Sequence, residues 1–514
     1  MLISTNPVLR RSEWLLPAAI FASFFFNIWG VPLFDLDEGA FSEATREMFL
    51  RGDFLSTYLN GEPRNDKPIL IYWLQAASVS LFGFNEFGLR LPSALAASGW
   101  VLMVYYFVTR VADRRRALVA ALITATCLEI SVMGKAATAD ALFNFCIASS
   151  MMLFFLHYRF LEKKYLYLSF LCIGLGFLTK GPVAVMVPLV VSLLFCLLRK
   201  EFRFWLAAVF NPLGILIFLL IGLPWYVISY FHDGGAFIND FLFNHNLGRF
   251  ESAKEGHSGK FFYYVPIVIL GVLPYTAALF LVLRRIPALI KDDLSLYLLF
   301  WFGFVFLFFS FSSTKLPHYV VYGYTAMTIL MALYFDQLRR RWLGLLPILL
   351  FLAVLLLLPE ILEMVRSRSH DEFLVLMLSN HQQDLGSSYR WIVLAGLLAV
   401  GYLLFEKRIE LQQALLASGF VTVLVVASAL LPAVAAVQQQ PIRDAAMLAR
   451  EQGLTVVQWH LKMPSFNVYS ETISPRRLPQ PGDYVLTKGH HLQKLDIERQ
   501  LFNRNGIALV KLKN

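Results

Sequence analysis

Three carboxylates follow the first apolar segment of the sequence. In the stretch LFDLDEGAF, Asp35, Asp37 and Glu38 come directly after a run long enough to lie in a bilayer. Carboxylates at that depth are costly to desolvate and commonly mark functional sites. An aspartate can take a proton from an acceptor hydroxyl. No basic residue stands beside Asp37 and Glu38 in the sequence, so we interpret this pair as catalytic candidates rather than as one half of a structural ion pair.

Lysines recur at the ends of later apolar segments. Lys67 stands in RNDKP, Lys180 in LTKGPV and Lys315 in SSTKLPHYV. A lysine can neutralise a phosphate that leaves during group transfer. Two alternatives stay open. Lys180 and Lys315 could be anchors whose ammonium groups reach the membrane interface, and RNDKP could be only a turn before Pro68.

Asp140, His245 and Arg249 extend this set of ionisable residues. Asp140 precedes an apolar helix, so it could cap that helix, contact a substrate, or do both. His245 lies close to Arg249 in the stretch FNHNLGR. It is either a hydrogen-bonded interface histidine or, beside a carboxylate, a ligand for a divalent metal ion.

The composition is that of a polytopic membrane protein. The chain has 514 residues, of which 58% are hydrophobic and 16% are charged, whereas soluble domains carry about 25% charged residues. The formal net charge of +10 comes from short Lys and Arg clusters between apolar runs and needs no nucleic acid to explain it. The cysteines all fall inside apolar runs without CxxC spacing and are predicted to be core residues: Cys127, Cys146, Cys172 and Cys196.

The basic clusters also indicate a topology. With Arg10 and Arg11 in the cytoplasm, the chain after residue 33 emerges on the outer side. Segment 69–83 is short for a span. If it lies along the membrane surface, the later clusters all fall inside: Arg110 with Arg114–Arg116, Arg159 with Lys163 and Lys164, Arg199 with Lys200 and Arg203, Arg284 with Arg285 and Lys291, Arg339–Arg341, and Lys407 with Arg408.

This topology predicts thirteen membrane spans. A second surface helix is expected over residues 41–50, with an apolar face that includes Phe41 and Met48 and with Gly52 at its end. The spans are expected at 14–33, 91–109, 117–133, 141–158, 165–179, 182–198, 205–231, 263–283, 294–311, 319–335, 342–358, 391–405 and 412–432.

Two domains are predicted. Residues 1–436 form the transmembrane part, and residues 437–514, with strand-like TVVQW and DYVLT, form a small α/β domain on the outer side. We find no GxGxxG or GKS/T loop and no GxSxG motif, which argues against a soluble nucleotide-binding fold and a serine hydrolase. We also find no internal repeat of the kind that suggests a transporter.

The same topology collects the ionisable residues on one face of the membrane. Carboxylates from the first outer loop meet lysines and histidines from later ones, whereas the inner loops carry little beyond basic anchors. Such a set suits a lipid substrate that bears phosphate. Sugar transfer from a polyprenyl-phosphate donor fits it, because the lipid can enter from the bilayer while its head group meets the polar mouth.

Several blocks resemble the bacterial protein-mannosyltransferase-like family, which includes the aminoarabinose transferases that modify lipid A. The run DLDEGAFSEATREMFLRGDFLSTYLNGEPRNDKPILIYW is highly specific, and TADALFNF, GLGFLTKGPVAV, FFYYVPIVILGVLPYT and SSTKLPHYVV follow in the same order. The resemblance covers most of residues 30–335. It implies a GT-C fold, juxtamembrane helices in the first outer loop, and a periplasmic domain.

The resemblance also implies roles for individual residues. The family's presumed base or acceptor-positioning group maps to Asp37, with Glu38 beside it, and the second-loop Asp maps to Asp140. Lys67 would hold donor phosphate. Lys180 and Arg249 match further cationic positions. An acidic residue and a later His that are associated with zinc map to Asp66 and His245, so a divalent metal (Zn, Mg or Mn) is a predicted cofactor.

The sequence departs from the aminoarabinose transferases at two places. It reads DEGAF where they resemble DETRY, and Asp66 stands where they usually carry Glu. The resemblance therefore identifies the broad family rather than the sugar.

We expect an integral membrane glycosyltransferase of the bacterial inner membrane, acting as a monomer with its active site toward the periplasm. It would move one sugar from undecaprenyl phosphate to lipid A or another envelope glycan. Three alternatives stay open: transfer to Ser or Thr of a protein, a flippase for lipid-linked sugars, and a polymerase or ligase that uses diphosphate-linked oligosaccharides.

Overall fold

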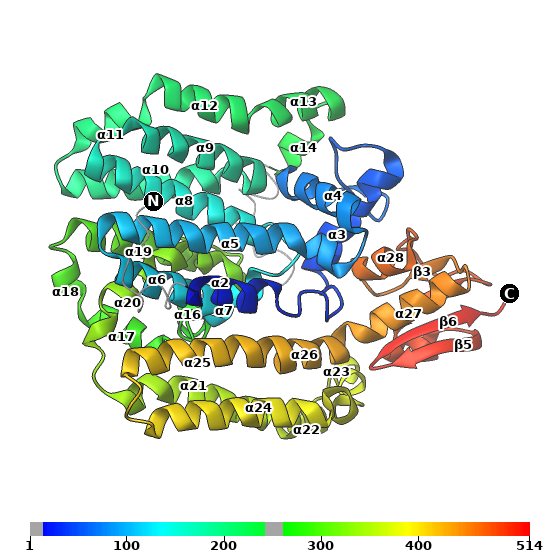
Figure 1. Ribbon diagram of the computed structural model, residues 1–514. Helices are drawn as coiled ribbons and strands as arrows, with labels where there is room; N and C mark the ends of the chain where they lie inside the picture. The colour runs from blue at the N-terminus through cyan, green and yellow to red at the C-terminus, as the bar shows by residue number, and fades with distance from the viewer. Residues whose placement is uncertain (1–13, 242–260) are drawn as a thin grey trace.

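The computed structural model describes residues 14–241 and 261–514. Arg10, Arg11, His245 and Arg249 lie outside these residues, so the sequence-based predictions for them stay predictions. The described chain is built mainly of helices that run side by side, and a small sheet and several short helices gather at one end of the bundle (Figure 1).

Many of the described helices lie where the sequence predicts spans. The helix over Leu15–Phe25 is α2 followed by the π-turn η1. The others in this part of the chain are α5 (Glu86–Val111), α6 (Arg114–Thr126), α7 (Leu128–Met133), α8 (Asp140–Phe160), α9 (Lys163–Lys180), α10 (Val183–Leu198), α11 (Phe202–Val209), α12 (Pro212–Gly222), α13 (Pro224–Asp233) and α14 (Ala236–Asn239).

The second half continues in the same way. It contains α16 (Tyr264–Gly271), α17 (Thr276–Arg284), α18 (Ile286–Leu289), α19 (Asp293–Phe311), the 3-10 segment η4 (Pro317–Gly323), α20 (Tyr324–Leu333), α21 (Arg341–Leu356), α22 (Leu358–Arg368), α23 (Glu372–Met377), α24 (His381–Phe405), α25 (Leu411–Val425) and α26 (Leu431–Gln438).

Local sequence signals start several of these helices. The side chains of Asn85, Asp113 and Asp292 accept hydrogen bonds from the first-turn amides of α5, α6 and α19, and such caps satisfy donors that have no partner inside the helix. Prolines also set boundaries, because a proline lacks the amide that a helix interior needs. Pro212 and Pro224 stand in the first turns of α12 and α13.

Six described helices are long and apolar enough to cross a membrane, or seven if the bent pair α21 and α22 counts as one span. The predicted spans 205–231 and 263–283 are not continuous helices. The first is divided into α11, α12 and α13, and the second is interrupted between α16 and α17 at Leu273 and Pro274. The prediction of thirteen spans therefore stays a prediction.

The packing is that of a membrane bundle in which α8 is almost entirely buried. In α8, 89% of an 18-residue apolar stretch is buried, whereas in α24 and in the combined stretch of α12 and α13 (Pro212–Asp233) only 28% is buried. The outer helices leave large apolar side chains exposed, such as Leu220 and Phe405. Lipid tails can cover such a surface without the cost of exposing it to water.

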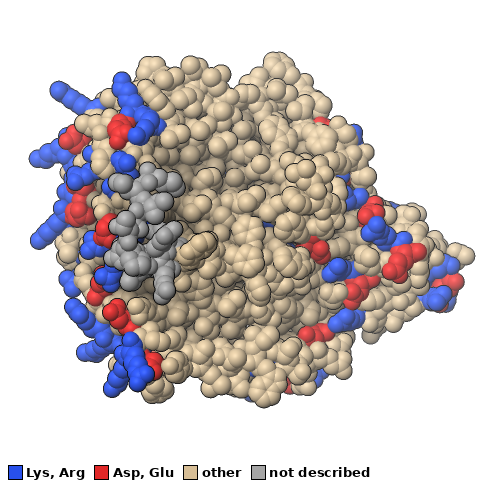
Figure 2. Space-filling model, in the orientation of Figure 1, with Lys and Arg blue, Asp and Glu red and all other residues tan. Residues whose placement is uncertain are grey.

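Charge is distributed unevenly along the bundle. Figure 2 shows Lys and Arg gathered at one end, a middle zone almost free of charge, and mixed charges toward the other end. Residues of the predicted inner clusters are exposed, including Arg114, Lys163, Lys200, Arg284 and Lys407.

The opposite end carries the first-loop helices and the C-terminal segment (Figure 1). Helix α3 (Asp37–Arg51) ends at Gly52, which has a positive φ of 64°, as predicted. Helix α4 (Leu70–Phe82) has 13 residues and so is about 20 Å long, which is too short for a hydrocarbon core of about 30 Å.

The C-terminal residues form a mixed four-stranded sheet in the order β3-β4-β6-β5. Strand β3 (Val456–Gln458) pairs parallel with β4 (Tyr484–Lys488), and β6 (Ile507–Leu512) pairs antiparallel with β4 and with β5 (Ile497–Arg504). Helices α27 (Gln440–Glu451) and α28 (Pro464–Ser470) accompany the sheet, and α28 packs against α3.

The polar face of α3 differs from the expectation for a surface helix. Ser42, Glu43, Arg46 and Glu47 are all buried. Arg46 forms an ion pair with Glu43 at 2.7 Å and donates hydrogen bonds to backbone carbonyls just after α28. The C-terminal segment therefore covers the face of α3 that the sequence would leave in water.

Candidate active site

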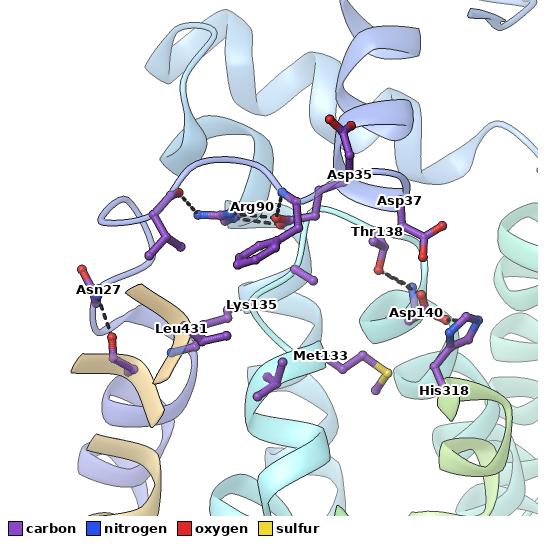
Figure 3. A pocket seen from close by; sticks show the side chains of 16 residues that line it. Asn27, Asp35, Asp37, Arg90, Met133, Lys135, Thr138, Asp140, His318 and Leu431 are labelled. Atoms are coloured by element: carbon purple, nitrogen blue, oxygen red, sulfur yellow. Dashed lines mark hydrogen bonds and ion pairs between the residues drawn. The ribbon is translucent and has the colours of Figure 1, made fainter. Parts of the chain in front are cut away.

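A cavity of about 320 Å³ lies where the start of α3 meets the segment between α7 and α8. Its wall also includes residues from α5, η4 and α26, and from the loop that precedes α3. The lining is part ionisable and part apolar, and it includes Asn27, Val31, Phe34, Asp35, Asp37, Glu38, Arg90, Val132, Met133, Lys135, Thr138, Asp140, His318 and Leu431 (Figure 3). Residues far apart in the sequence thus share one cavity.

Asp37 is the carboxylate best placed to react. It is the first residue of α3, and its side chain is exposed at the cavity. In Figure 3 it lies beside Asp140 and His318. Asp37 therefore has the exposure that a proton acceptor needs.

Glu38, its neighbour, is fully engaged. Its carboxylate accepts hydrogen bonds from Arg90 Nε and Nη2 at 2.8 and 2.7 Å, and from the amides of Phe34 and Ala137 at 2.9 and 2.6 Å. Burial alone would raise the pKa of Glu38, but the Arg90 cation and these donors hold it below the ordinary value. Four donors leave this carboxylate little capacity to bind a substrate.

Arg90 is the partner that the sequence did not reveal. It stands 52 residues after Glu38 and also donates to the carbonyl oxygens of Ile28, Val31 and Pro32. It therefore ties the loop before α3 to α5. The one signal in the sequence was an arginine just before a predicted span, which does not by itself distinguish an anchor from a buried partner.

Asp140 and Lys180 form a buried ion pair beside the cavity. The Asp140 carboxylate also accepts a hydrogen bond from Thr138 Oγ1 at 2.9 Å, and Lys180 donates to the Tyr322 hydroxyl at 2.8 Å. Asp140 is the first residue of α8, and Ala139 occupies the cap position without a side-chain bond. Asp140 thus binds a lysine rather than capping its helix.

His318 connects the charged groups of several loops. Its Nε2 lies 3.9 Å from Asp140. Burial lowers the pKa of His318, Asp140 and Asp37 act in the opposite direction, and Lys180 and Lys67 lower it further. Asp37, Lys67, Asp140 and Lys180 therefore all lie close enough to influence the pKa of this imidazole.

Asp35, the first of the three carboxylates, is held by the C-terminal segment. It accepts a hydrogen bond from the Ser465 amide at 3.0 Å and another from the Ser465 hydroxyl. Burial raises the pKa of Asp35 to about 7 despite these donors. Ser465 belongs to no catalytic motif, so it could not be selected from the sequence alone.

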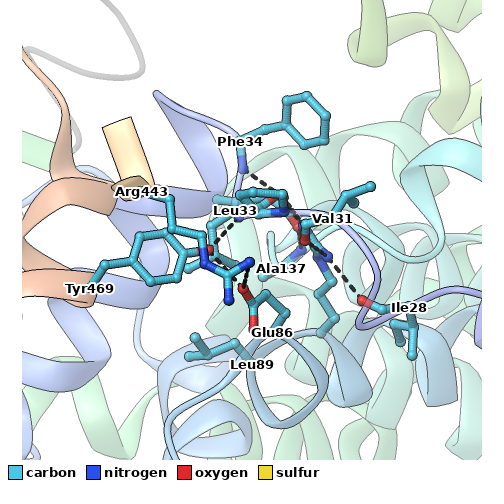
Figure 4. Close-up of polar contacts among 12 residues, drawn as sticks. Ile28, Val31, Leu33, Phe34, Glu86, Leu89, Ala137, Arg443 and Tyr469 are labelled. Atoms are coloured by element: carbon cyan, nitrogen blue, oxygen red, sulfur yellow. Dashed lines mark hydrogen bonds and ion pairs between the residues drawn. The ribbon is translucent and has the colours of Figure 1, made fainter. Parts of the chain in front are cut away.

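Other contacts hold the same two segments together. The Tyr469 hydroxyl accepts a hydrogen bond from the amide of Leu33 at 2.8 Å and donates one to Glu86 at 3.0 Å, and Arg443 lies 3.8 Å from Glu86 (Figure 4). The loop that ends at Asp37 is therefore fixed on one side by Arg90 and on the other by α28.

Two of the predicted lysines, Lys67 and Lys315, are not part of the cavity lining. Lys67 donates to the carbonyl of Asp66 at 3.2 Å, and the Asp66 carboxylate lies 3.7 Å from Arg64. Lys315 is buried and donates to the Ser312 carbonyl. Burial lowers the pKa of Lys315.

The described residues contain no group of three or more His, Cys, Asp and Glu side chains that could hold a metal ion. Of the two predicted ligands, Asp66 has the Arg64 cation beside it, and His245 lies outside the described residues. One carboxylate next to an arginine is a poor fit for a divalent cation.

Comparisons with known proteins agree with this architecture. The family described as dolichyl-phosphate-mannose-protein mannosyltransferase matches residues 66–228. An uncharacterised protein of Aquifex aeolicus is 31% identical over 329 residues, which is 64% of this chain and 74% of that protein. The undecaprenyl phosphate-alpha-4-amino-4-deoxy-L-arabinose arabinosyl transferase of Edwardsiella ictaluri is 30% identical over 64% of this chain, and the match spans 60% of that enzyme's length.

Solved structures extend the likeness to the whole fold. The crystal structure of ArnT from Cupriavidus metallidurans bound to undecaprenyl phosphate has a TM-score of 0.82 and covers 99% of this chain and 98% of its own, at 19% sequence identity. The oligosaccharyltransferase of Archaeoglobus fulgidus has a TM-score of 0.51 at 13% identity. At sequence identities this low, the similarity shows a shared fold and no more.

Proposed function

This chain belongs to the protein-mannosyltransferase-like family of membrane glycosyltransferases with the GT-C fold, and from that premise we propose that it transfers one sugar from a polyprenyl phosphate to an acceptor hydroxyl. The observation that carries the proposal is the exposed carboxylate of Asp37 in a cavity shared with Asp140 and His318. A proton acceptor and a set of cations at one cavity are what displacement of a phosphate by a hydroxyl requires.

In the proposed reaction, Asp37 takes the proton of the acceptor hydroxyl. The acceptor oxygen forms a bond to the anomeric carbon, the bond from that carbon to the phosphate oxygen breaks, and polyprenyl phosphate leaves with the electron pair. Lys180, held by Asp140 and Tyr322, and Lys67 supply positive charge for the departing phosphate. Glu38 positions Asp37 through Arg90 and does not react.

The donor is proposed from the names of the relatives. Several are named as transferases for undecaprenyl phosphate-linked 4-amino-4-deoxy-L-arabinose, which supports an undecaprenyl-phosphate sugar as donor. Lipid A or another envelope glycan is proposed as acceptor from the resemblance of the sequence blocks to the aminoarabinose transferases. The mannosyltransferase family description supports a second candidate, transfer to Ser or Thr of a protein.

The orientation and the domains are part of the same proposal. The basic end of the bundle (Figure 2) would face the cytoplasm and the cavity end the periplasm. The thirteen spans, a periplasmic domain over residues 437–514 and a monomeric state belong to this arrangement. Phosphate binding by Arg249 and Lys315 completes it.

The test is an Asp37→Asn variant assayed for sugar transfer from an undecaprenyl-phosphate sugar to lipid A. We expect the rate to fall by about 10²–10⁴, the range typical of a positioned general base. Glu62→Gln, which changes an exposed carboxylate on a short strand in the same loop, should keep the wild-type rate. Near-normal turnover of Asp37→Asn would remove Asp37 from the mechanism. Transfer to a peptide but not to lipid A would favour the second candidate.

A further inference from the structure

Lys135 is a buried cation in the cavity wall that the reaction described above does not use. The residue is 8% exposed and stands between α7 and α8. Its ammonium group has three hydrogens to donate, and it makes one hydrogen bond, to the carbonyl oxygen of Phe26 at 3.2 Å. Within residues 14–241 and 261–514, Lys135 has no carboxylate at ion-pair distance.

The neighbouring charges already have other partners. Arg90 is engaged by Glu38, Lys180 by Asp140, and Asp35 by Ser465. His318 lies beside Asp140, and Asp37 is exposed at the cavity. Positive charge at Lys135 is therefore not balanced by any described carboxylate in contact with it.

An unbalanced ammonium group in such a place is costly. Burial and the nearby Arg90 cation lower the pKa of Lys135 to about 8. Loss of water around a charge is offset when an opposite charge and further acceptors take its place. In Figure 3, Lys135 extends toward Asn27 and Leu431, away from Asp37 and His318, so an acceptor group there would bind at the other end of the cavity.

We propose that Lys135 binds a phosphate or carboxylate group of the substrate that occupies this cavity, so that the anionic group lies at the Asn27 and Leu431 end while the reacting hydroxyl lies at Asp37. The inference rests on the proposed function, since it assumes that this cavity receives a substrate. Val132, Met133 and Leu431 make part of the cavity wall apolar. The site therefore suits a molecule with a localised negative charge and little other polarity around it, such as a phosphorylated glycolipid or a lipid-linked head group.

The test measures binding by the full chain in nanodiscs, with three probes: lipid A with its phosphates, lipid A after phosphatase treatment, and undecaprenyl phosphate. Lys135→Met keeps the apolar stem and removes the charge. We expect it to weaken binding of one anionic probe about tenfold, as for a lost charged hydrogen bond, and to leave phosphatase-treated lipid A unchanged. Loss with lipid A assigns the anion to the acceptor, and loss with undecaprenyl phosphate assigns it to the donor.

Two further variants serve as controls for charge and for position. Lys135→Arg preserves the charge and should bind within a few-fold of wild type, and Lys291→Met, at the basic end of the bundle, should behave as wild type. Wild-type affinity for the anionic probe should fall as pH rises through about 8, where Lys135 loses its proton, and Lys135→Arg should abolish that fall. The inference is overturned if Lys135→Met binds all probes as wild type does, or weakens all three equally.

Failure of the proposed function would look different. In that case the wild-type protein would transfer no sugar, while the charge-dependent binding at Lys135 would still be measurable. Asp37→Asn should bind the anionic probe normally, because Asp37 lies at the opposite end of the cavity (Figure 3).

Discussion

At the scale of single residues, the adjacent carboxylates Asp37 and Glu38 have opposite environments. Asp37 is exposed at the cavity, whereas Glu38 is buried and accepts four hydrogen bonds. In a helix, neighbouring residues point about 100° apart, so one can face a cavity while the next faces the protein interior. A pair that looks like two catalytic acids in the sequence divides into one reacting group and one positioning group.

Glu38→Gln should therefore act mainly on stability. Removing one partner of a buried ion pair leaves Arg90 uncompensated, which typically costs about 3–5 kcal/mol, and we expect a clear fall in the unfolding temperature in detergent. The double variant Glu38→Gln with Arg90→Met should recover part of the loss, because the buried charge is gone. A Glu38→Gln protein that unfolds as wild type does but transfers no sugar would instead place Glu38 in the chemistry.

At the scale of elements, the site depends on the contact between α3 and α28. Gly39 allows this approach, because a Cβ at that position would lie 1.9 Å from Asp35 Oδ1 and 2.7 Å from the Ser465 amide nitrogen. Arg46, Asp35 and Tyr469 then supply polar contacts across the same junction. The C-terminal segment is thus joined to the loop that carries Asp37, rather than only appended to the bundle.

Asp35 should make this junction sensitive to pH. Its pKa is raised to about 7 in the folded protein, above the value of about 3.9 in an unfolded chain. The folded state therefore holds the proton longer, and the free energy of unfolding should fall as pH rises from about 4 to about 7. Thermal unfolding across this range should show the fall in wild type.

Asp35→Asn is the variant that isolates this effect, because asparagine does not titrate. It should lack this component of the pH dependence, whereas Asp496→Asn, which changes an exposed carboxylate, should keep it. Identical pH profiles for wild type and Asp35→Asn would show that another group is responsible.

At the scale of the whole molecule, the charge distribution predicts the orientation in the membrane. The basic end lies across an almost uncharged zone from the end that carries α3 and the C-terminal segment (Figures 1 and 2), and basic loops are retained in the cytoplasm. A protein inserted this way presents the cavity to the periplasm.

Cysteine labelling can check this orientation. In a background without the four native cysteines, Lys462→Cys should react with a membrane-impermeant maleimide added to cells with a permeabilised outer membrane. Lys200→Cys, at the basic end, should react only after lysis. Both positions are exposed in the structure, so the reverse pattern would contradict the proposed orientation and, with it, a periplasmic site.

The sequence by itself determined the membrane class, many of the helix positions and the identity of the polar residues near the site. These features are local, because hydropathy, charge clusters and caps act over one helix or one loop. Asp37, Asp140 and Lys180 could be selected in this way, and the structure brings all three to the surroundings of His318.

Only the tertiary structure decided which of these residues are paired and which face open space. Glu38 meets Arg90 across 52 residues, Asp35 meets Ser465 across 430 residues, and Lys135 lacks a carboxylate partner among the described residues. Such relations depend on the packing of distant segments, for which a single sequence holds no direct signal. The physical reason is that desolvation and ion pairing depend on distances through space, and the order of residues along the chain does not specify these distances.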